Sequence, residues 1–371
     1  MRTINQSSML WIALMCFLAV PVPALSTENE LSLEEMQMRV AEASNPNPPW
    51  TGPTTGAIAQ KGKRIAVIAE DLRNGGILGV AQGVAEAAKI LEWPLKIFDA
   101  GGTPKGRVEA IQKVLSGAFD GLILIGSDAE ALRPQLSNFS RQNIPIVGWH
   151  VGPEAGVMTN SPVSVNVSTD PLEVAKITAM AAVIQSQGKA GVVIFTDSNF
   201  EIAISKANAM AEVIKACHQC SLLEIRDVAI SDSHSLMAGT TQDLLLKYGQ
   251  DWTYALAIND IYFDYMMPEL IKQGTNAQDI NLLSAGDGSA AAFQRIFAQS
   301  FQVGTVAEPL NLHGWQLVDE LNRLFAGDNI DGHVVPVHLV TPENVSFDGG
   351  QEFIFDPDNG YRDIYLGIWM P

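Results

Sequence analysis

Short apolar stretches alternate with amphipathic ones through most of this 371-residue chain. Strand-like apolar runs are found at residues 64–70, 95–100, 120–126, 144–150, 190–197, 222–230, 254–260, 281–287 and 302–308. Helical periodicity separates them, at residues 77–91, 104–117, 129–142, 171–187, 200–216, 234–248, 261–273 and 288–299. Near-continuous apolar strands between amphipathic helices are typical of parallel sheets covered on both faces. The pattern therefore predicts an α/β fold with two doubly wound parallel-sheet lobes in tandem.

Polar and aromatic side chains follow the predicted strands at their carboxyl ends. In open α/β sheets, ligands bind outside these ends, in the crevice where the strand order switches. This position selects the following candidates: Asp71, Arg73 and Asn74 of "EDLRNGG", Asp128, Trp149, His150, Asn259, Asp287 and Glu308. Asp and Asn are also preferred helix N-caps, so Asp128, Asp197 and Asp287 have a structural alternative, and Asp260 is either a cap or a contact.

The residue types at these ends suit a ligand rich in hydroxyl groups. Carboxylates accept hydrogen bonds in several directions, and an Asn amide both donates and accepts. Trp149 and Phe200 can offer apolar faces to the C–H side of a sugar. A cationic ligand is the alternative, because Asp170, Asp260 and Asp287 together supply negative charge and a tryptophan can supply a cation–π wall.

No catalytic constellation is present in the sequence. It contains no Gly-x-Ser-x-Gly elbow, no Walker phosphate loop and no His-Glu-x-x-His pair. The glycines after the first strand, Gly75, Gly76 and Gly79, do not have the dinucleotide-binding spacing. We therefore expect a protein that is not an enzyme and that needs neither a cofactor nor a metal.

Composition and charge limit the classes of molecule that the protein can bind. The chain is 47% hydrophobic and 17% charged, as in ordinary globular proteins, and its length suggests two domains. A net charge of −18 argues against nucleic acids and anionic membranes, which need a basic face. We expect a monomer.

The N-terminal sequence predicts that the protein is exported from the cytoplasm. Arg2, the apolar run 9–20 and the small residues "VPA" (22–24) form a signal peptide of residues 1–24, which places the mature protein in the periplasm. A lipid anchor through Cys16 is the alternative. No later stretch is long enough to insert into a membrane. Residues 25–62 form an N-terminal arm, with a Ser-capped helix at 32–44 and a Pro/Gly-rich stretch at 45–56.

Cys217 and Cys220 lie in "ACHQCS", at the end of a predicted helix. The order of residues does not fit haem attachment, and two further zinc ligands are not close in sequence. A local disulfide or two thiols are the interpretations, with a redox role as the alternative.

The ordered series "DLRNGG", "NIPIVGWH", "VNVSTDP", "YALAINDIYFD", "LLSAGDGS" and "VGTVAEPLNLHGWQLV" resembles the periplasmic sugar-binding proteins of ABC transporters, of the ribose-binding type. The resemblance covers roughly residues 63 to 340. It implies two lobes joined by three crossover strands, with a ligand cleft between them that closes about a hinge. It places Asn259, Asp287 and Asp170 among the hydroxyl-binding residues, and Glu308 at a crossover.

The resemblance also implies a division of the chain. Lobe 1 would hold residues 63–168 and 309–332, and lobe 2 residues 169–308 and 333–371. It implies a receptor that passes a small polyhydroxylated solute to the membrane permease of an ABC transporter. A sensory receptor that presents its ligand to a histidine kinase or chemoreceptor is the alternative.

The sequence departs from the ribose-binding pattern at three places. No aromatic follows the first strand, and Trp149-His150 replaces the usual Asp-Arg. Where an Arg is usual, "FEIAISKANAM" offers Ile204, Ser205 and Lys206. We therefore widen the expected ligand class to sugars, sugar alcohols and related polyols.

Overall fold

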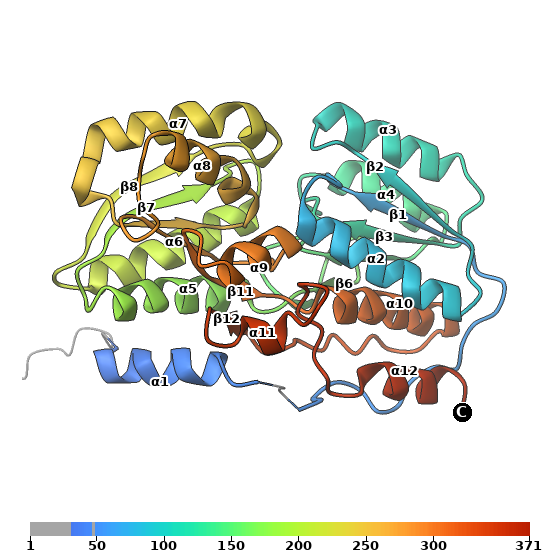
Figure 1. Ribbon diagram of the computed structural model, residues 1–371. Helices are drawn as coiled ribbons and strands as arrows, with labels where there is room; N and C mark the ends of the chain where they lie inside the picture. Colours follow the sequence, from blue (N-terminus) through green and yellow to red (C-terminus); the bar gives the residue numbers. More distant parts are fainter. Residues whose placement is uncertain (1–30, 47–48) are drawn as a thin grey trace, which may run out of the picture. The chain divides into compact units, whose positions relative to one another are not determined.

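The structure is a computed structural model that describes residues 31–46 and 49–371 (Figure 1). The predicted signal peptide, residues 1–24, lies outside the described residues. Within the described part of the chain, no helix combines the length and the apolar character that crossing a membrane requires.

Lobe 1 is built on a six-stranded sheet with the order β2-β1-β3-β4-β6-β5. Its strands are β1 (Ile65–Ala69), β2 (Leu95–Asp99), β3 (Gly121–Ile125), β4 (Ile146–Trp149), β5 (Gly156–Val157) and β6 (Val165–Val167). Only the short β5 pairs antiparallel, with β6. Helices α2 (Gly75–Ile90), α3 (Pro104–Leu115) and α4 (Arg133–Arg141) alternate with the strands. The first four strands and the three helices confirm the sequence pattern.

Lobe 2 repeats the plan with the strand order β12-β11-β10-β9-β7-β8. Its strands are β7 (Gly191–Thr196), β8 (Ser221–Asp227), β9 (Tyr254–Ala257), β10 (Asn281–Ser284), β11 (Gln302–Ala307) and β12 (His338–Val340). The helices are α5 (Pro171–Gln185), α6 (Glu201–Ala216), α7 (Ser233–Tyr248), α8 (Ile261–Lys272), α9 (Ala290–Phe297) and α11 (Val345–Asp348). The strands pair in parallel except for β12, which runs antiparallel to β11.

The chain passes between the lobes after β6, after β11 and after α10 (Leu310–Ala326), as expected. Helix α10 packs on α2, and its apolar side chains join those of β1, β3 and β4 in one core of lobe 1. A second core lies on the other face of this sheet, under α3 and α4. Both faces are therefore buried, which explains why β1 and β3 are apolar throughout.

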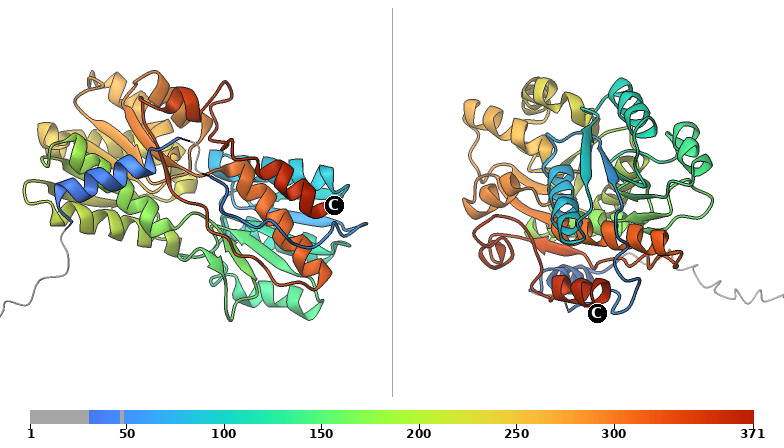
Figure 2. Two further views of the ribbon diagram at one scale, coloured as in Figure 1. Left: turned by 90° about the horizontal axis from the view of Figure 1, so that it is seen from below. Right: turned by 90° about the vertical axis from the view of Figure 1, so that its right-hand side faces the viewer.

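The C-terminal helix α12 (Tyr361–Trp369) differs from the expected division, which placed residues 333–371 in lobe 2. It packs on α10 (Figure 2). Tyr361, Tyr365 and Trp369 are buried in the core of lobe 1. Trp369 stacks on Trp315 of α10, with ring centroids 5.4 Å apart. Only tertiary packing explains this placement, because a short aromatic helix can cover either lobe.

The N-terminal arm contacts both lobes. Helix α1 (Leu33–Ala43) begins at Ser32 with a capping box and packs on α5 of lobe 2. The following chain runs along lobe 1, where Asn322 of α10 donates to the carbonyl oxygens of Ala57 and Ile58. The described residues of the arm, from Ser32 onward, are thus part of the folded body.

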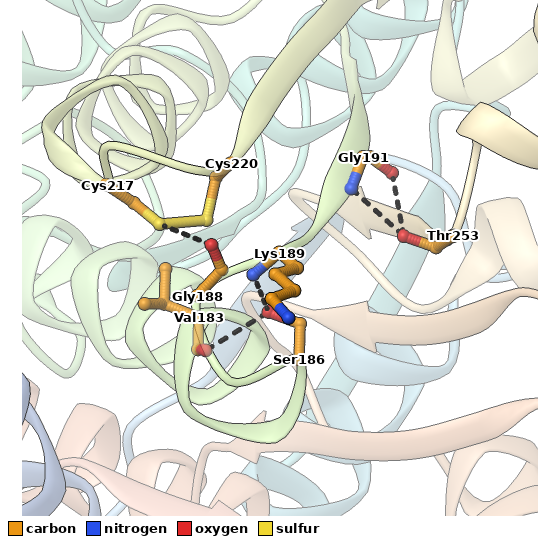
Figure 3. Close-up of a disulfide and its surroundings, with 8 residues drawn as sticks. All are labelled: Val183, Ser186, Gly188, Lys189, Gly191, Cys217, Cys220 and Thr253. Carbon is orange, nitrogen blue, oxygen red and sulfur yellow. Dashed lines mark hydrogen bonds between the residues drawn. A yellow bond between two sulfur atoms is a disulfide. The ribbon is translucent and has the colours of Figure 1, made fainter.

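Cys217 and Cys220 form a disulfide at the C-terminal end of α6 (Figure 3). The Sγ atom of Cys217 lies 3.4 Å from the carbonyl oxygen of Gly188, in the turn before β7. Of the two interpretations from the sequence, the structure has the local disulfide.

Candidate functional site

A cavity lies between the two lobes, at the carboxyl ends of strands from both sheets. The centre of a water molecule can occupy about 80 Å³ of this cavity. Since one water needs roughly 10–15 Å³ of such volume, there is room for on the order of six water-sized groups. The polar lining comes from both lobes and comprises Glu70, Asp71, Asn74, Arg107 and His150 of lobe 1, and Asp197, Asn199, Lys206, Ser231, Asn259 and Asp287 of lobe 2.

The structure brings together most of the residues that the sequence selected. Those that line the cavity are Asp71, Asn74, Trp149, His150, Phe200, Asn259 and Asp287. They come from segments up to 216 positions apart (Asp71 to Asp287), and each lies at or just beyond a strand end or at the start of a helix. The candidates at the strand ends therefore meet at one cavity, and their contact with a ligand stays a prediction.

Four selected residues do not line the cavity. Arg73 is half exposed and binds Asp71, and Glu308 lies behind His150. Asp128 accepts hydrogen bonds from the backbone N–H groups of Glu130 and Ala131, so it is a local cap.

Asp170 lies elsewhere, contrary to the expectation from the resemblance. It is exposed, and its Oδ1 accepts from the N–H groups of Leu172 and Glu173 at the start of α5. It faces a separate hollow beside Arg39 and Glu42 of the arm. The cap satisfies the helix N-terminus and turns this carboxylate away from the cleft.

Four further charged residues line the cavity: Glu70, Arg107, Asp197 and Lys206. Of these, the sequence marked Asp197 as a strand end with a capping alternative but did not select it. Glu70 and Asp197 do follow predicted strands, so their position was a usable signal. Arg107 lies inside α3, where nothing in the local sequence separates it from solvent-exposed basic residues. Lys206 lies inside α6, and the family resemblance offered it only together with Ile204 and Ser205, in place of the usual Arg.

The Arg107 guanidinium binds Glu70 with two nitrogens. Its Nε lies 2.8 Å from both carboxylate oxygens, and its Nη2 lies 2.6 Å from Oε1. Ser127 donates to the other side of the same carboxylate. The guanidinium also lies 5.6 Å from the ring centroid of Phe200, which belongs to lobe 2. Arg107 therefore contacts both walls of the cavity.

Asn259 and Asp287 meet across the ends of β9 and β10. The Nδ2 of Asn259 donates to Oδ2 of Asp287 at 2.6 Å, and its Oδ1 accepts from the N–H of Ile261. Burial raises the pKa of Asp287 to about 6, although the charges of His150 and Lys206 oppose this. Lys206 is buried too, and its Nζ donates to the carbonyl oxygen of Ala285.

Asp260, the neighbour of Asn259, is structural. Its Oδ2 accepts from the N–H groups of Gly288 and Ser289, and its Oδ1 accepts from Ser284 and Gln302. The apolar strand β9 thus ends on two polar residues with different tasks: Asn259 faces the cavity and Asp260 holds the next loop in place.

His150 and Glu308 form a buried pair behind the cavity. The Nε2 of His150 donates to Oε1 of Glu308 at 2.8 Å, and the His150 ring stacks on Trp149 with centroids 3.6 Å apart. Trp149 in turn donates to Nδ1 of His313 on α10. Burial alone would raise the pKa of Glu308, but the charges and hydrogen bonds of His150 and His313 hold it well below its usual value.

His150, Asp287 and Glu308 place one nitrogen and two oxygens within 4.8 Å of one another, a donor set that can hold a metal ion. Two features oppose this. The Nε2 proton of His150 is used in the bond to Glu308, and the buried ammonium of Lys206 already provides positive charge beside Asp287. We assign no metal to these residues.

A family model described as a periplasmic binding protein domain matches residues 65–329. No curated protein matches the sequence at a significant level.

Many solved structures share the fold. An ABC transporter solute-binding protein from Agrobacterium vitis with bound allitol is 20% identical, with a TM-score of 0.67, over 77% of this chain and 97% of that one. A solute-binding protein from Mycobacterium smegmatis with bound glycerol is 17% identical, with a TM-score of 0.69, over 79% and 99%. The Caulobacter myo-inositol binding protein with bound myo-inositol is 15% identical, with a TM-score of 0.68, over 78% and 97%.

Proposed function

The chain belongs to the periplasmic binding protein domain family, and we propose that it is a periplasmic receptor for a small, uncharged polyol or sugar. The observation that carries this proposal is the cavity, to which both lobes contribute hydrogen-bonding side chains. A solute held there contacts both lobes only when they are close together. Binding therefore shifts the equilibrium between open and closed states by the difference in the ligand's affinity for the two.

The charges of the cavity favour a neutral ligand. Every carboxylate in or behind the cavity has its own donor or cation: Glu70 has Arg107, Asp71 has Arg73, Asp197 has the N–H groups of Asn199 and Ile230, Asp287 has Asn259, and Glu308 has His150. These carboxylates are thus already engaged, and the ammonium of Lys206 donates to the carbonyl oxygen of Ala285 beside Asp287. Burying a further unbalanced charge among them is costly. A polyol needs only the donors and acceptors that these groups still offer.

The apolar part of the lining suits the carbon skeleton of such a solute. It comprises Ile77, Trp149, Phe200, Ile202, Ala203, Ile230 and Ile258. Trp149 and Phe200 are engaged with His150 and Arg107, so the aliphatic residues provide most of the remaining apolar contact. The size of the cavity favours a compact solute over a disaccharide.

We expect the bound solute to be passed to the membrane permease of an ABC transporter. The relatives named above that are described as ABC transporter solute-binding proteins support this destination. Uptake of the radiolabelled ligand by cells with and without this protein tests it. Normal uptake in its absence would instead favour the sensory receptor, whose ligand chemistry is the same.

Calorimetric titration against a panel tests the ligand class. The panel comprises allitol, myo-inositol, glycerol, arabinose and ribose, with gluconate and glucosamine as charged controls. We expect at least one neutral member to bind and to raise the melting temperature by mass action, and the charged controls to be inactive. Binding of gluconate or glucosamine alone would contradict the neutral ligand, and a flat response to all would contradict the receptor.

A further inference from the structure

The N-terminus of α2 in lobe 1 lies directly against the loop 286–289 of lobe 2. Asn74 caps this helix by accepting from the N–H of Gly76, and the helix then opens with Gly75 and Gly76. A Cβ atom added to Gly75 would lie 2.7 Å from the Cβ of Ser289. One added to Gly76 would lie 2.1 Å from Oδ2 of Asp287. Real Cβ atoms essentially never come within 3.0 Å of a heavy atom of a residue distant in the chain.

The backbone conformation of the helix does not require glycine at these two positions. Neither Gly75 nor Gly76 has a positive φ angle, so alanine would fit the backbone at both positions. Glycine is also less favourable than alanine in a helix. The remaining reason for glycine is the close approach of lobe 2.

The facing loop is held firmly in lobe 2. Asp260 accepts from the N–H groups of Gly288 and Ser289, and the N–H of Glu308 donates to the carbonyl oxygen of Asp287. The Ser289 side chain caps α9 by accepting from the N–H of Ala292. A side chain at Gly75 would therefore push against a loop that cannot move by itself, and the two lobes would separate instead.

We propose that Gly75 is a positioning residue for lobe closure, and that its missing side chain lets the lobes come close enough to enclose the ligand. Gly75 and Ser289 do not line the cavity, so neither is placed to act through direct ligand contact. The inference rests on the proposed receptor function in one respect: closure must be coupled to binding. Apparent affinity then falls in proportion to the fraction of molecules able to close.

Paired substitutions test the contact. We expect G75A to raise the dissociation constant for the ligand found in the panel at least tenfold. S289G removes the Cβ that Gly75→Ala would meet and keeps an acceptable N-cap residue. The double variant G75A/S289G should bind within about threefold of S289G alone. G239A, in α7 with nothing within 4 Å of the added Cβ, is the matched control and should bind like the wild type. Wild-type affinity in G75A, or no rescue by S289G, would overturn the proposal.

Interlobe distances give a readout that needs no ligand. Spin labels are attached at K105C in α3 and L246C in α7, where the native side chains are 88% and 87% exposed, with Cys16 changed to Ser. Cys217 and Cys220 are joined to each other and do not react. We expect a short-distance population in the wild type that falls at least fivefold in G75A and returns in G75A/S289G. Identical distributions in all three would overturn the proposal. Because the panel is not used, a failure of the proposed function stays distinguishable from a failure of this inference.

Discussion

His150 of lobe 1 donates a hydrogen bond from Nε2 to Oε1 of Glu308, the residue that follows β11 of lobe 2, across 2.8 Å. Both side chains are buried, at 9% and 0% exposure. The pair lies where the chain crosses between the lobes, and His150 also lines the cavity. One polar contact therefore joins the crossover between the lobes to the cavity.

The first prediction concerns Glu308. E308Q keeps the shape of the side chain but removes its charge, and we expect the free energy of unfolding at pH 7 to fall by about 1–3 kcal/mol. Because the folded-state pKa of Glu308 lies well below the unfolded value, its contribution is present above the unfolded pKa and is lost as pH falls through the folded pKa. Urea denaturation from pH 7 down to pH 3 should show the difference shrinking only below about pH 4.5. A difference that does not depend on pH would contradict this account.

Asp287 should show the opposite pH dependence. Burial raises its pKa to about 6, so the folded protein holds this proton more tightly than the unfolded chain does. Stability relative to D287N should therefore fall as pH rises from about 4 to above 6, by at most about 3 kcal/mol, which is two pKa units. Thermal denaturation of both proteins across this range measures it. D328N, at an exposed position, is the control, and an equal slope in both variants would contradict the assignment.

Removal of Arg107 should show how strongly the Glu70 carboxylate destabilises the fold when it has no cation beside it. R107M leaves a buried carboxylate without its cation, and we expect unfolding to become easier by about 2–4 kcal/mol, somewhat less than for a fully buried pair. The double variant E70Q/R107M should recover most of this loss, because no unbalanced charge remains. Chemical denaturation of the two variants and E70Q completes the cycle. Purely additive effects would show that the pair is not coupled.

Substitutions of Asn259 and Asp170 should distinguish a residue that contributes to ligand binding from one that only caps a helix. N259A removes a cavity residue that holds Asp287, so we expect a rise in the ligand dissociation constant of at least tenfold. D170A removes the cap of α5, so it should lower stability by about 1 kcal/mol and leave affinity unchanged. Titration and denaturation of each variant measure the two effects. A loss of affinity in D170A would restore the site that the family resemblance implied.

Strands β1, β3 and β7 and their flanking helices could be predicted because their signal is local. A strand covered on both faces must be apolar along its whole length, and its helices must repeat their apolar positions every three to four residues. The strand-end rule extended this local signal to Asn259, Asp287 and His150. It also selected Asp128 and Asp170, because helix caps and ligand contacts use the same residue types at the same places.

The local sequence pattern could not show where the side chains of Arg107 and Lys206, or helix α12, would lie in the folded protein. A basic residue inside a helix looks the same whether it faces solvent or a cleft, and the partner that decides, such as Glu70 for Arg107, lies 37 positions away. The sequence by itself therefore determined the layered α/β plan and the edge of each sheet at which the cavity lies. Only the tertiary structure decided which charges balance one another, which lobe the C-terminus covers, and that Gly75 meets Ser289. These depend on the close approach of segments far apart in the chain. There, a few tenths of an ångström separate an ordinary van der Waals contact from a steric clash.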